Sequence, residues 1–105
     1  MDKLIKKVEK WGDSKGITGG DNFFNQWQKV NEEFGELTAE IDFFKEGHGD
    51  LNSFKMELGD LLVTLIVITK ASDTSIKECL ELAYNKISKR KGETINGIFV
   101  KESDL

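Results

Sequence analysis

Five acidic residues are grouped in two short motifs, and their side chains could bind a metal ion together. The motifs Glu32-Glu33-Phe34-Gly35-Glu36 and Glu57-Leu58-Gly59-Asp60 each place two carboxylates three residues apart. Residues at this spacing lie on the same side of a helix, so each helix would present a pair of carboxylates to its neighbour. Such close like charges repel, and burying an unpaired carboxylate is costly. Two facing pairs therefore require a cation or water, and oxygen donors favour Mg²⁺, Mn²⁺ or Ca²⁺ over zinc or copper.

Hydration is the alternative explanation of these acidic residues, because most carboxylates on helices are simply exposed to water. The position of the second motif argues against this alternative. Glu57 and Asp60 stand directly before residues 61–68, one of the most apolar segments of the chain. Carboxylates so close to a segment that must be buried are expected to have a function.

A second group of residues is suited to phosphate, and it lies near the end of the last expected helix. Phosphate contact is one interpretation of these side chains, with Arg90 as a bidentate donor. The alternative is that the cations only complement the negative end of the helix dipole. The candidates are Asn85, Lys86, Lys89, Arg90 and Lys91, together with Lys55 just before the second acidic motif.

Aromatic side chains could provide a wall on which a nucleobase stacks. The candidates are Trp11, Trp27 and Phe43, and core packing is the alternative for each of them. Trp27 belongs to an apolar seam and is therefore expected in the core. Phe43 lies off that seam, so it is the preferred stacking residue.

The acidic motifs must be held by helices, and the chain has no proline that would interrupt them. The first motif falls in a helix that follows Asp21 as its N-cap. Apolar residues in this helix alternate spacings of four and three, which predicts near-antiparallel packing against a neighbour. The second motif falls in a helix over about residues 51–71, capped by Asp50. The apolar seam of the first of these helices consists of Phe23, Trp27, Val30, Phe34, Leu37, Ile41 and Phe44.

Two further helices and a tail complete an expected all-α fold. A short helix over residues 2–11 ends at Gly12. A capping box at residues 75–78 opens the last helix, and Gly92 ends it. The following Asn96-Gly97 pair indicates either a hairpin turn or a bent extended tail.

Length and composition limit the class of protein. The 105 residues are enough for one domain, taken as residues 1–105. The net charge of −4 does not indicate the basic surface that binds a nucleic-acid polymer. Cys79 is the only cysteine and is expected in the core, so an internal disulfide is excluded and a reducing cytoplasm is indicated. We expect neither a signal peptide nor a membrane contact, since residues 61–68 are far too few to span a bilayer.

The two acidic motifs resemble the signature of the MazG-like all-α nucleoside triphosphate pyrophosphohydrolases. Each motif lies in an apolar helix and has glycine directly before its last acid, and their separation falls within the range that this family tolerates. The segment Lys89-Arg90-Lys91-Gly92, followed by Asn96-Gly97-Ile98-Phe99-Val100-Lys101, is similar to the tail of small phage-type members. The matching segments cover much of the chain from Gln26 to Leu105. This resemblance implies a MazG-like four-helix bundle with a short extended C-terminal tail.

The same resemblance implies a Mg²⁺-dependent enzyme, with Mn²⁺ as a substitute, that cleaves (d)NTP to (d)NMP and pyrophosphate in cytoplasmic nucleotide-pool housecleaning. The ion would be held by Glu33, Glu36, Glu57 and Asp60, and the attacking water would be oriented or deprotonated by Glu32 or Glu36. Asn85 with Lys86 or Lys89 would contact the phosphates. A polar stripe that includes Glu33, Glu36 and Glu40 runs beside the apolar seam. The alternative is a non-catalytic helical oligomer that binds nucleotide, or a basic protein partner, through this acidic stripe.

Self-association is the last expectation, and it follows from residues 61–68. Their apolar side chains point in nearly all directions around a helix, and one small bundle covers only part of that circumference. A second copy of the chain would cover the rest. We therefore expect a homodimer or homotetramer, with Ile66 and Val67 in the interface.

Overall fold

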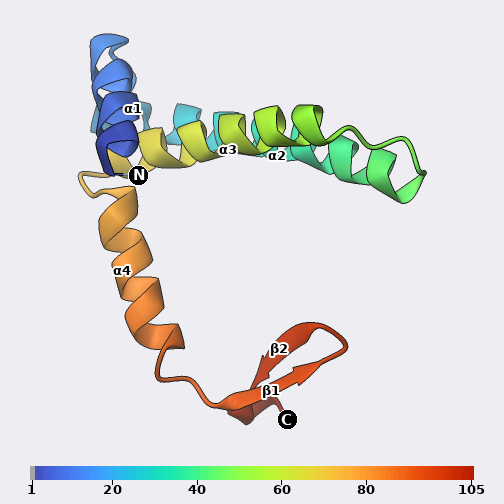
Figure 1. Cartoon of the computed structure of the whole chain (residues 1–105). Coiled ribbons are helices and arrows are strands. Elements are labelled where there is room, and N and C mark those ends of the chain that lie inside the picture. Colours follow the sequence, from blue (N-terminus) through green and yellow to red (C-terminus); the bar gives the residue numbers. More distant parts are fainter. Residues whose placement is uncertain (1) are drawn as a thin grey trace.

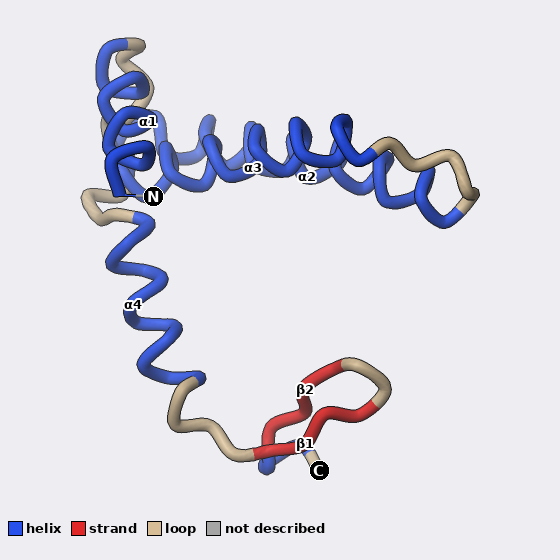
Figure 2. The backbone as a smooth tube through the Cα atoms, viewed as in Figure 1, coloured by secondary structure: helices blue, strands red, loops and turns tan. Residues whose placement is uncertain are grey.

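The computed structural model describes residues 2–105 as four helices followed by a two-stranded hairpin, which confirms the expected all-α class with a short extended tail (Figures 1 and 2). Single 3-10 turns precede the second helix and follow the second strand. The elements are α1 (Asp2–Ser14), a 3-10 turn (Gly20–Asn22), α2 (Phe23–Lys45), α3 (Leu51–Ala71), α4 (Ile76–Ile87), β1 (Gly92–Ile95), β2 (Ile98–Lys101) and a 3-10 turn (Glu102–Asp104).

The core lies where α1 crosses the long hairpin formed by α2 and α3. These two helices run side by side in opposite directions, as the alternating apolar spacing predicts (Figure 1). The buried apolar side chains are Val30 from α2 and Ile66, Val67 and Ala71 from α3. Burial is thus concentrated at the end of the hairpin that α1 covers, and the acidic motifs lie between this end and the tip of the hairpin.

The expectation that Gly12 ends the first helix is wrong, because α1 continues to Ser14. Gly12 is buried against α3, and a Cβ added there would lie 3.4 Å from Val67 Cγ2 and 2.9 Å from Thr18 Cγ2. The glycine therefore serves a close approach of two helices. Gly16, with φ of +70°, follows the helix end instead.

Helix caps account for most of the remaining boundaries. The Asp50 carboxylate accepts hydrogen bonds from the Asn52 and Ser53 backbone N–H groups at 3.4 and 3.3 Å, which confirms the predicted cap of α3. The Ser75 hydroxyl likewise accepts from the Glu78 backbone N–H at 3.1 Å. Asp21 is not the cap of α2, because it lies within the preceding 3-10 turn and α2 begins at Phe23.

Residues 76–105, which we term the C-terminal arm, extend away from the α2–α3 hairpin (Figure 1). No residue of α4 is buried, and Cys79 is exposed rather than in the core, because only the start of α4 meets the rest of the chain. At the end of the arm, β1 and β2 pair antiparallel around Asn96 and Gly97, whose φ values are 50° and 80°. Positive φ at both turn residues is what a two-residue hairpin requires, so the Asn-Gly pair forms a hairpin turn.

The apolar surfaces differ from expectation in two places. Ile66 and Val67 are interior residues of the single chain, whereas Leu62 on the same helix is 43% exposed, so Leu62 rather than the other two is available to a second copy. On α2, Trp27 and Phe34 are exposed although they belong to the predicted seam. Among residues 2–105, no helix is long and apolar enough to cross a membrane.

Candidate metal centre

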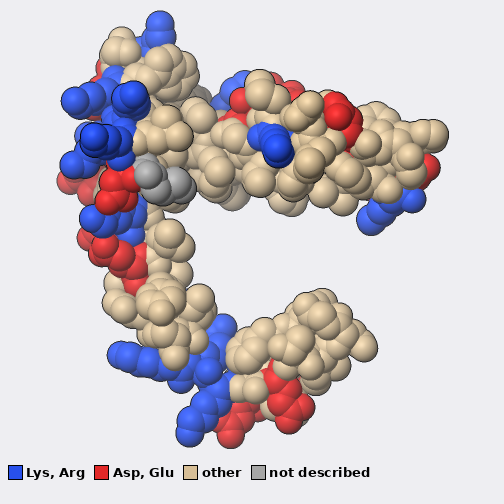
Figure 3. Space-filling view, viewed as in Figure 1, with Lys and Arg blue, Asp and Glu red and all other residues tan. Residues whose placement is uncertain are grey.

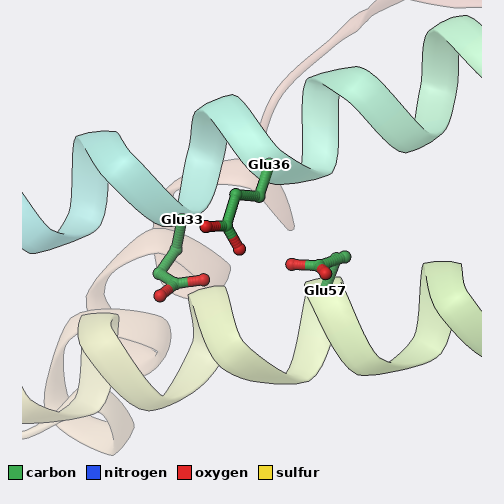
Figure 4. A group of neighbouring side chains, drawn as sticks. All are labelled: Glu33, Glu36 and Glu57. Atoms are coloured by element: carbon green, nitrogen blue, oxygen red, sulfur yellow. The ribbon is translucent and has the colours of Figure 1, made fainter.

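Three of the five predicted carboxylates meet between α2 and α3. Glu33 and Glu36, one turn apart on α2, face Glu57 from α3, and one oxygen from each lies within 4.8 Å of the others (Figure 4). The spacing of three residues puts the first two on one side of their helix. The antiparallel course of α3 then brings Glu57 opposite to them.

Burial makes this cluster different from a hydrated acidic surface. Glu33 is only 8% exposed, and Glu57 is half-buried. One oxygen of each, Glu33 Oε2 and Glu57 Oε2, is buried and has no hydrogen-bond partner within the described part of the chain. Leaving a charged buried oxygen unpaired is costly, so the cluster is arranged for a ligand that supplies positive charge or protons.

Among residues 2–105, Lys29 is the cation that forms ion pairs with this cluster. Its Nζ lies 3.3 Å from Glu33 Oε1 and 3.5 Å from Glu32 Oε1. The hydrogen bond to Glu33 and the negative charge of Glu32 raise the pKa of Lys29 above its usual value. Our sequence interpretation missed this role, although a lysine four residues before the buried acid on one helix is a recognisable ion-pair spacing.

The neighbouring carboxylates shift the pKa of Glu36. Its pKa is raised, first by a hydrogen bond and the negative charge of Glu57, then by slight desolvation of this exposed side chain and by the charge of Glu32. Hydrogen bonding with Glu33 acts weakly in the opposite direction. Because the negative charge of Glu57 lies beside it, Glu36 takes up a proton more readily than an isolated carboxyl group does.

A cavity of about 430 Å³ adjoins the carboxylates on the side of α1. Glu33 and Lys29 form its boundary with the cluster, and Asp60 lies in the same wall one turn after Glu57. Asp60 is exposed and lies outside the group of three close carboxylates, although it lines the space next to them. Trp11 of α1 and Asn25 and Gln26 of α2 also line the cavity.

The other predicted site residues are distributed more widely. Glu32 is exposed and contacts Lys29, and Lys55 lines a separate groove between α1 and α3. Phe43 is exposed two turns beyond Glu36 towards the tip of the α2–α3 hairpin. The residues proposed for phosphate, Asn85, Lys86, Lys89 and Arg90, lie at the end of α4 and just after it, on the C-terminal arm.

The donor set fits a hard divalent cation. All three close side chains offer carboxylate oxygens, no histidine or cysteine takes part, and two of the oxygens are buried without a partner among residues 2–105. Oxygen-only ligation with neighbouring open space is typical of Mg²⁺ and Mn²⁺ sites that share the ion with a phosphate group. Glu33, Glu36 and Glu57 would be the protein ligands.

A family model describing the MazG nucleotide pyrophosphohydrolase domain matches residues 25–95 of the chain. The matched range begins in the first turn of α2 and ends with β1, so it contains both acidic motifs, Lys29 and the basic end of α4. No curated protein and no solved structure matches the chain.

Proposed function

The chain belongs to the MazG nucleotide pyrophosphohydrolase domain family, and we propose that it hydrolyses nucleoside triphosphates to nucleoside monophosphate and pyrophosphate with Mg²⁺ held by Glu33, Glu36 and Glu57. Mn²⁺ is expected to substitute for Mg²⁺. The observation that carries this proposal is the pair of buried, unpartnered oxygens on Glu33 and Glu57 within a cluster of three carboxylates. A divalent cation bound there would supply positive charge to the phosphates and lower the pKa of a water molecule.

Glu36 is the better of the two predicted proton acceptors. It belongs to the group of three close carboxylates and faces Glu57 across the two helices, so it lies beside the place where an ion and its bound water would be held. Glu32, in contrast, is exposed and engaged by Lys29. In the proposed step, the oxygen of water forms a bond to the α-phosphorus, its proton passes to Glu36, and the bond between the α-phosphorus and the bridging oxygen breaks to release pyrophosphate.

The adjoining cavity supports binding of the nucleoside part of the substrate. Its volume of about 430 Å³ lies within the range of roughly 300–1,000 Å³ that small-molecule pockets occupy. The Trp11 ring offers a stacking surface, and the Asn25 and Gln26 amides offer both donors and acceptors to a base or sugar. Lys29, between the cavity and the carboxylates, is suited to a phosphate oxygen.

The proposal is tested by incubating the protein and Mg²⁺ with a panel of ribo- and deoxyribonucleoside triphosphates and separating the products. Monophosphate with pyrophosphate is expected, and water enriched in ¹⁸O should label the monophosphate. Glu36→Gln is expected to abolish turnover while circular dichroism stays unchanged. Asp60→Asn should do the same, because Asp60 in the wall of the adjoining cavity is proposed as a fourth oxygen donor to the ion. Formation of diphosphate with phosphate would refute the proposed reaction. Tight binding of a non-hydrolysable triphosphate without any turnover would instead favour the non-catalytic alternative.

A further inference from the structure

The ion pair between Lys29 and Glu33 joins two side chains of very different freedom. The Lys29 side chain is 47% exposed, whereas the Glu33 side chain is 10% exposed. The lysine carries its charge on a flexible four-carbon stem, and the glutamate is held by the packing of α2 against α3. If the two charged groups separate, the lysine is therefore the one that moves.

The ion pair is also a weak one. On a helix, a lysine that precedes a glutamate by four residues is in the less favourable of the two orders. The Lys29 amine is shared, since its Nζ lies 3.3 Å from Glu33 Oε1 and 3.5 Å from Glu32 Oε1. Water screens an ion pair at such an exposed position. The pair thus places the amine beside Glu33 without fixing it there.

Glu33 has two roles that compete with each other. Its Oε1 is paired with Lys29, and its carboxylate also belongs to the cluster with Glu36 and Glu57 (Figure 4). A divalent cation held by this cluster and the ammonium group of Lys29 would lie beside the same carboxylate, and two like charges so close repel. Lys29 therefore competes with the ion for Glu33.

The adjoining cavity has a use for the displaced amine. Two carboxylates, Glu33 and Asp60, line it, and among its described lining residues Lys29 is the only cation. Figure 3 shows Lys and Arg side chains gathered over α1 and around the end of α4, with few on the drawn face of the α2–α3 hairpin. A triphosphate that enters beside Glu33 and Asp60 would be repelled, and an ammonium group with three N–H donors offsets this repulsion.

We propose that Lys29 changes partner when substrate binds: it neutralises Glu33 in the metal-free protein, and it moves to a phosphate oxygen of the nucleotide once Glu33 takes part in holding the ion. Lys29 then couples the two ligands, because the ion releases the amine that the nucleotide needs, and the nucleotide removes the competitor of the ion. The competition for Glu33 involves only the ion. The phosphate contact rests on the proposed function, so the two are measured separately.

The competition is tested with the metal alone. Lys29→Met removes the charge but keeps an unbranched stem, and it should lower the dissociation constant of Mn²⁺ by about threefold in the absence of nucleotide. Electron paramagnetic resonance of free Mn²⁺ measures this, with circular dichroism as the control for folding. Lys29→Arg keeps the charge and should bind Mn²⁺ like the wild type.

Lys45→Met is the matched control. It removes the same charge from the last turn of the same helix, and Lys45 forms no ion pair within residues 2–105. Its affinity for Mn²⁺ should equal that of the wild type. Weaker binding of Mn²⁺ by Lys29→Met would mean that the lysine only orients Glu33 for the ion. Either that result or an unchanged affinity would overturn the competition.

The phosphate contact is tested with a nucleoside triphosphate analogue that has a carbon bridge between its α and β phosphorus atoms. At saturating Mn²⁺, isothermal titration calorimetry should show that Lys29→Met binds this analogue about tenfold more weakly than the wild type, whereas Lys45→Met binds it equally well. An unchanged affinity of Lys29→Met would overturn the contact.

Opposite shifts for the ion and for the nucleotide are the signature of an exchange of partners, and neither measurement needs turnover. If both shifts appear and the wild-type protein hydrolyses nothing, the exchange stands and the proposed reaction fails. If the wild type hydrolyses nucleotides and the shifts are absent, the reaction stands and the exchange fails. A wild-type protein and a Lys29→Met variant that both bind no Mn²⁺ would overturn both proposals.

Discussion

Replacing Glu33 with glutamine should make the metal-free protein more stable and should weaken its stabilisation by Mg²⁺. Glu33 is 8% exposed, and one of its oxygens is buried without a partner among residues 2–105, so its charge is unfavourable in the metal-free protein. A buried unsatisfied group costs about 1–3 kcal/mol, and more when it is charged. The Lys29 amine compensates weakly, because it is about half exposed and screened by water. We therefore expect Glu33→Gln to raise the stability of the metal-free protein by about 1 kcal/mol.

The effect of Mg²⁺ should change in the opposite direction. A ligand at 100 times its dissociation constant stabilises the native state by about 2.7 kcal/mol. An unfolding entropy of about 2.1 cal/mol/K per residue converts this to a rise in Tm of about 12 °C for a chain of this length. A tenfold weaker site would give about 6 °C at the same Mg²⁺ concentration, and a hundredfold weaker site about 2 °C. The metal-free Glu33→Gln variant should thus have a higher Tm than the metal-free wild type, and Mg²⁺ should raise its Tm by half as much or less.

Thermal unfolding followed by circular dichroism measures both changes, with chelator-treated protein and KCl at matched ionic strength as the reference. Glu32→Gln is the matched control, because it removes the same charge from the adjacent residue, also contacts Lys29, and is exposed. This control should gain the full Mg²⁺ effect. The reasoning is refuted if Mg²⁺ stabilises Glu33→Gln as much as the wild type, or if Glu32→Gln loses an equal share.

Three further predictions follow from the same geometry. The pKa of Glu36 is raised above its ordinary value of 4.5 in the folded, metal-free protein. The free energy of unfolding should therefore fall as the pH rises from about 4.5 through the raised pKa, and this fall should be absent in Glu36→Gln. Gly12→Ala should lower the free energy of unfolding by about 1–3 kcal/mol, since the new Cβ would lie 2.9 Å from a neighbouring methyl group. At Gly35 a new Cβ would meet nothing within 4 Å, so Gly35→Ala should raise the free energy of unfolding by up to about 1 kcal/mol. Chemical denaturation measures both. Trp11→Ala should raise KM for the nucleotide with little change in circular dichroism. Trp27→Ala, outside the cavity lining, should leave KM unchanged.

The helices were predictable because their signals are local. Asp50 and Ser75 each accept a backbone hydrogen bond two or three residues away, so the start of α3 and of α4 can be read from neighbouring letters. The limits of α3, residues 51–71, agree with the prediction for the same reason. Gly12 was misread because its neighbour is Val67 on another helix, and a glycine that allows close packing looks like one that ends a helix.

The candidate site was predictable only in part. The spacing of the acids correctly brings Glu33, Glu36 and Glu57 together, since helical periodicity fixes which side chains share a side. The cavity was missed because Trp11 reaches it from a helix that precedes α2 by a loop of unpredictable course. The ion pair with Lys29 could have been predicted from its spacing, but the burial of Glu33 depends on how α2 and α3 pack against each other.

The apolar seam of α2 shows that a periodic pattern of apolar residues does not by itself predict which of them are buried within the chain. The repeat of four and three residues predicts that one side of the helix is covered, and Val30 in this repeat is buried. Trp27, Phe34 and Ile41 belong to the same repeat and are exposed in the single chain. Hydrophobic burial has no preference for the chain that provides the cover, so the same pattern serves packing within one copy or between two.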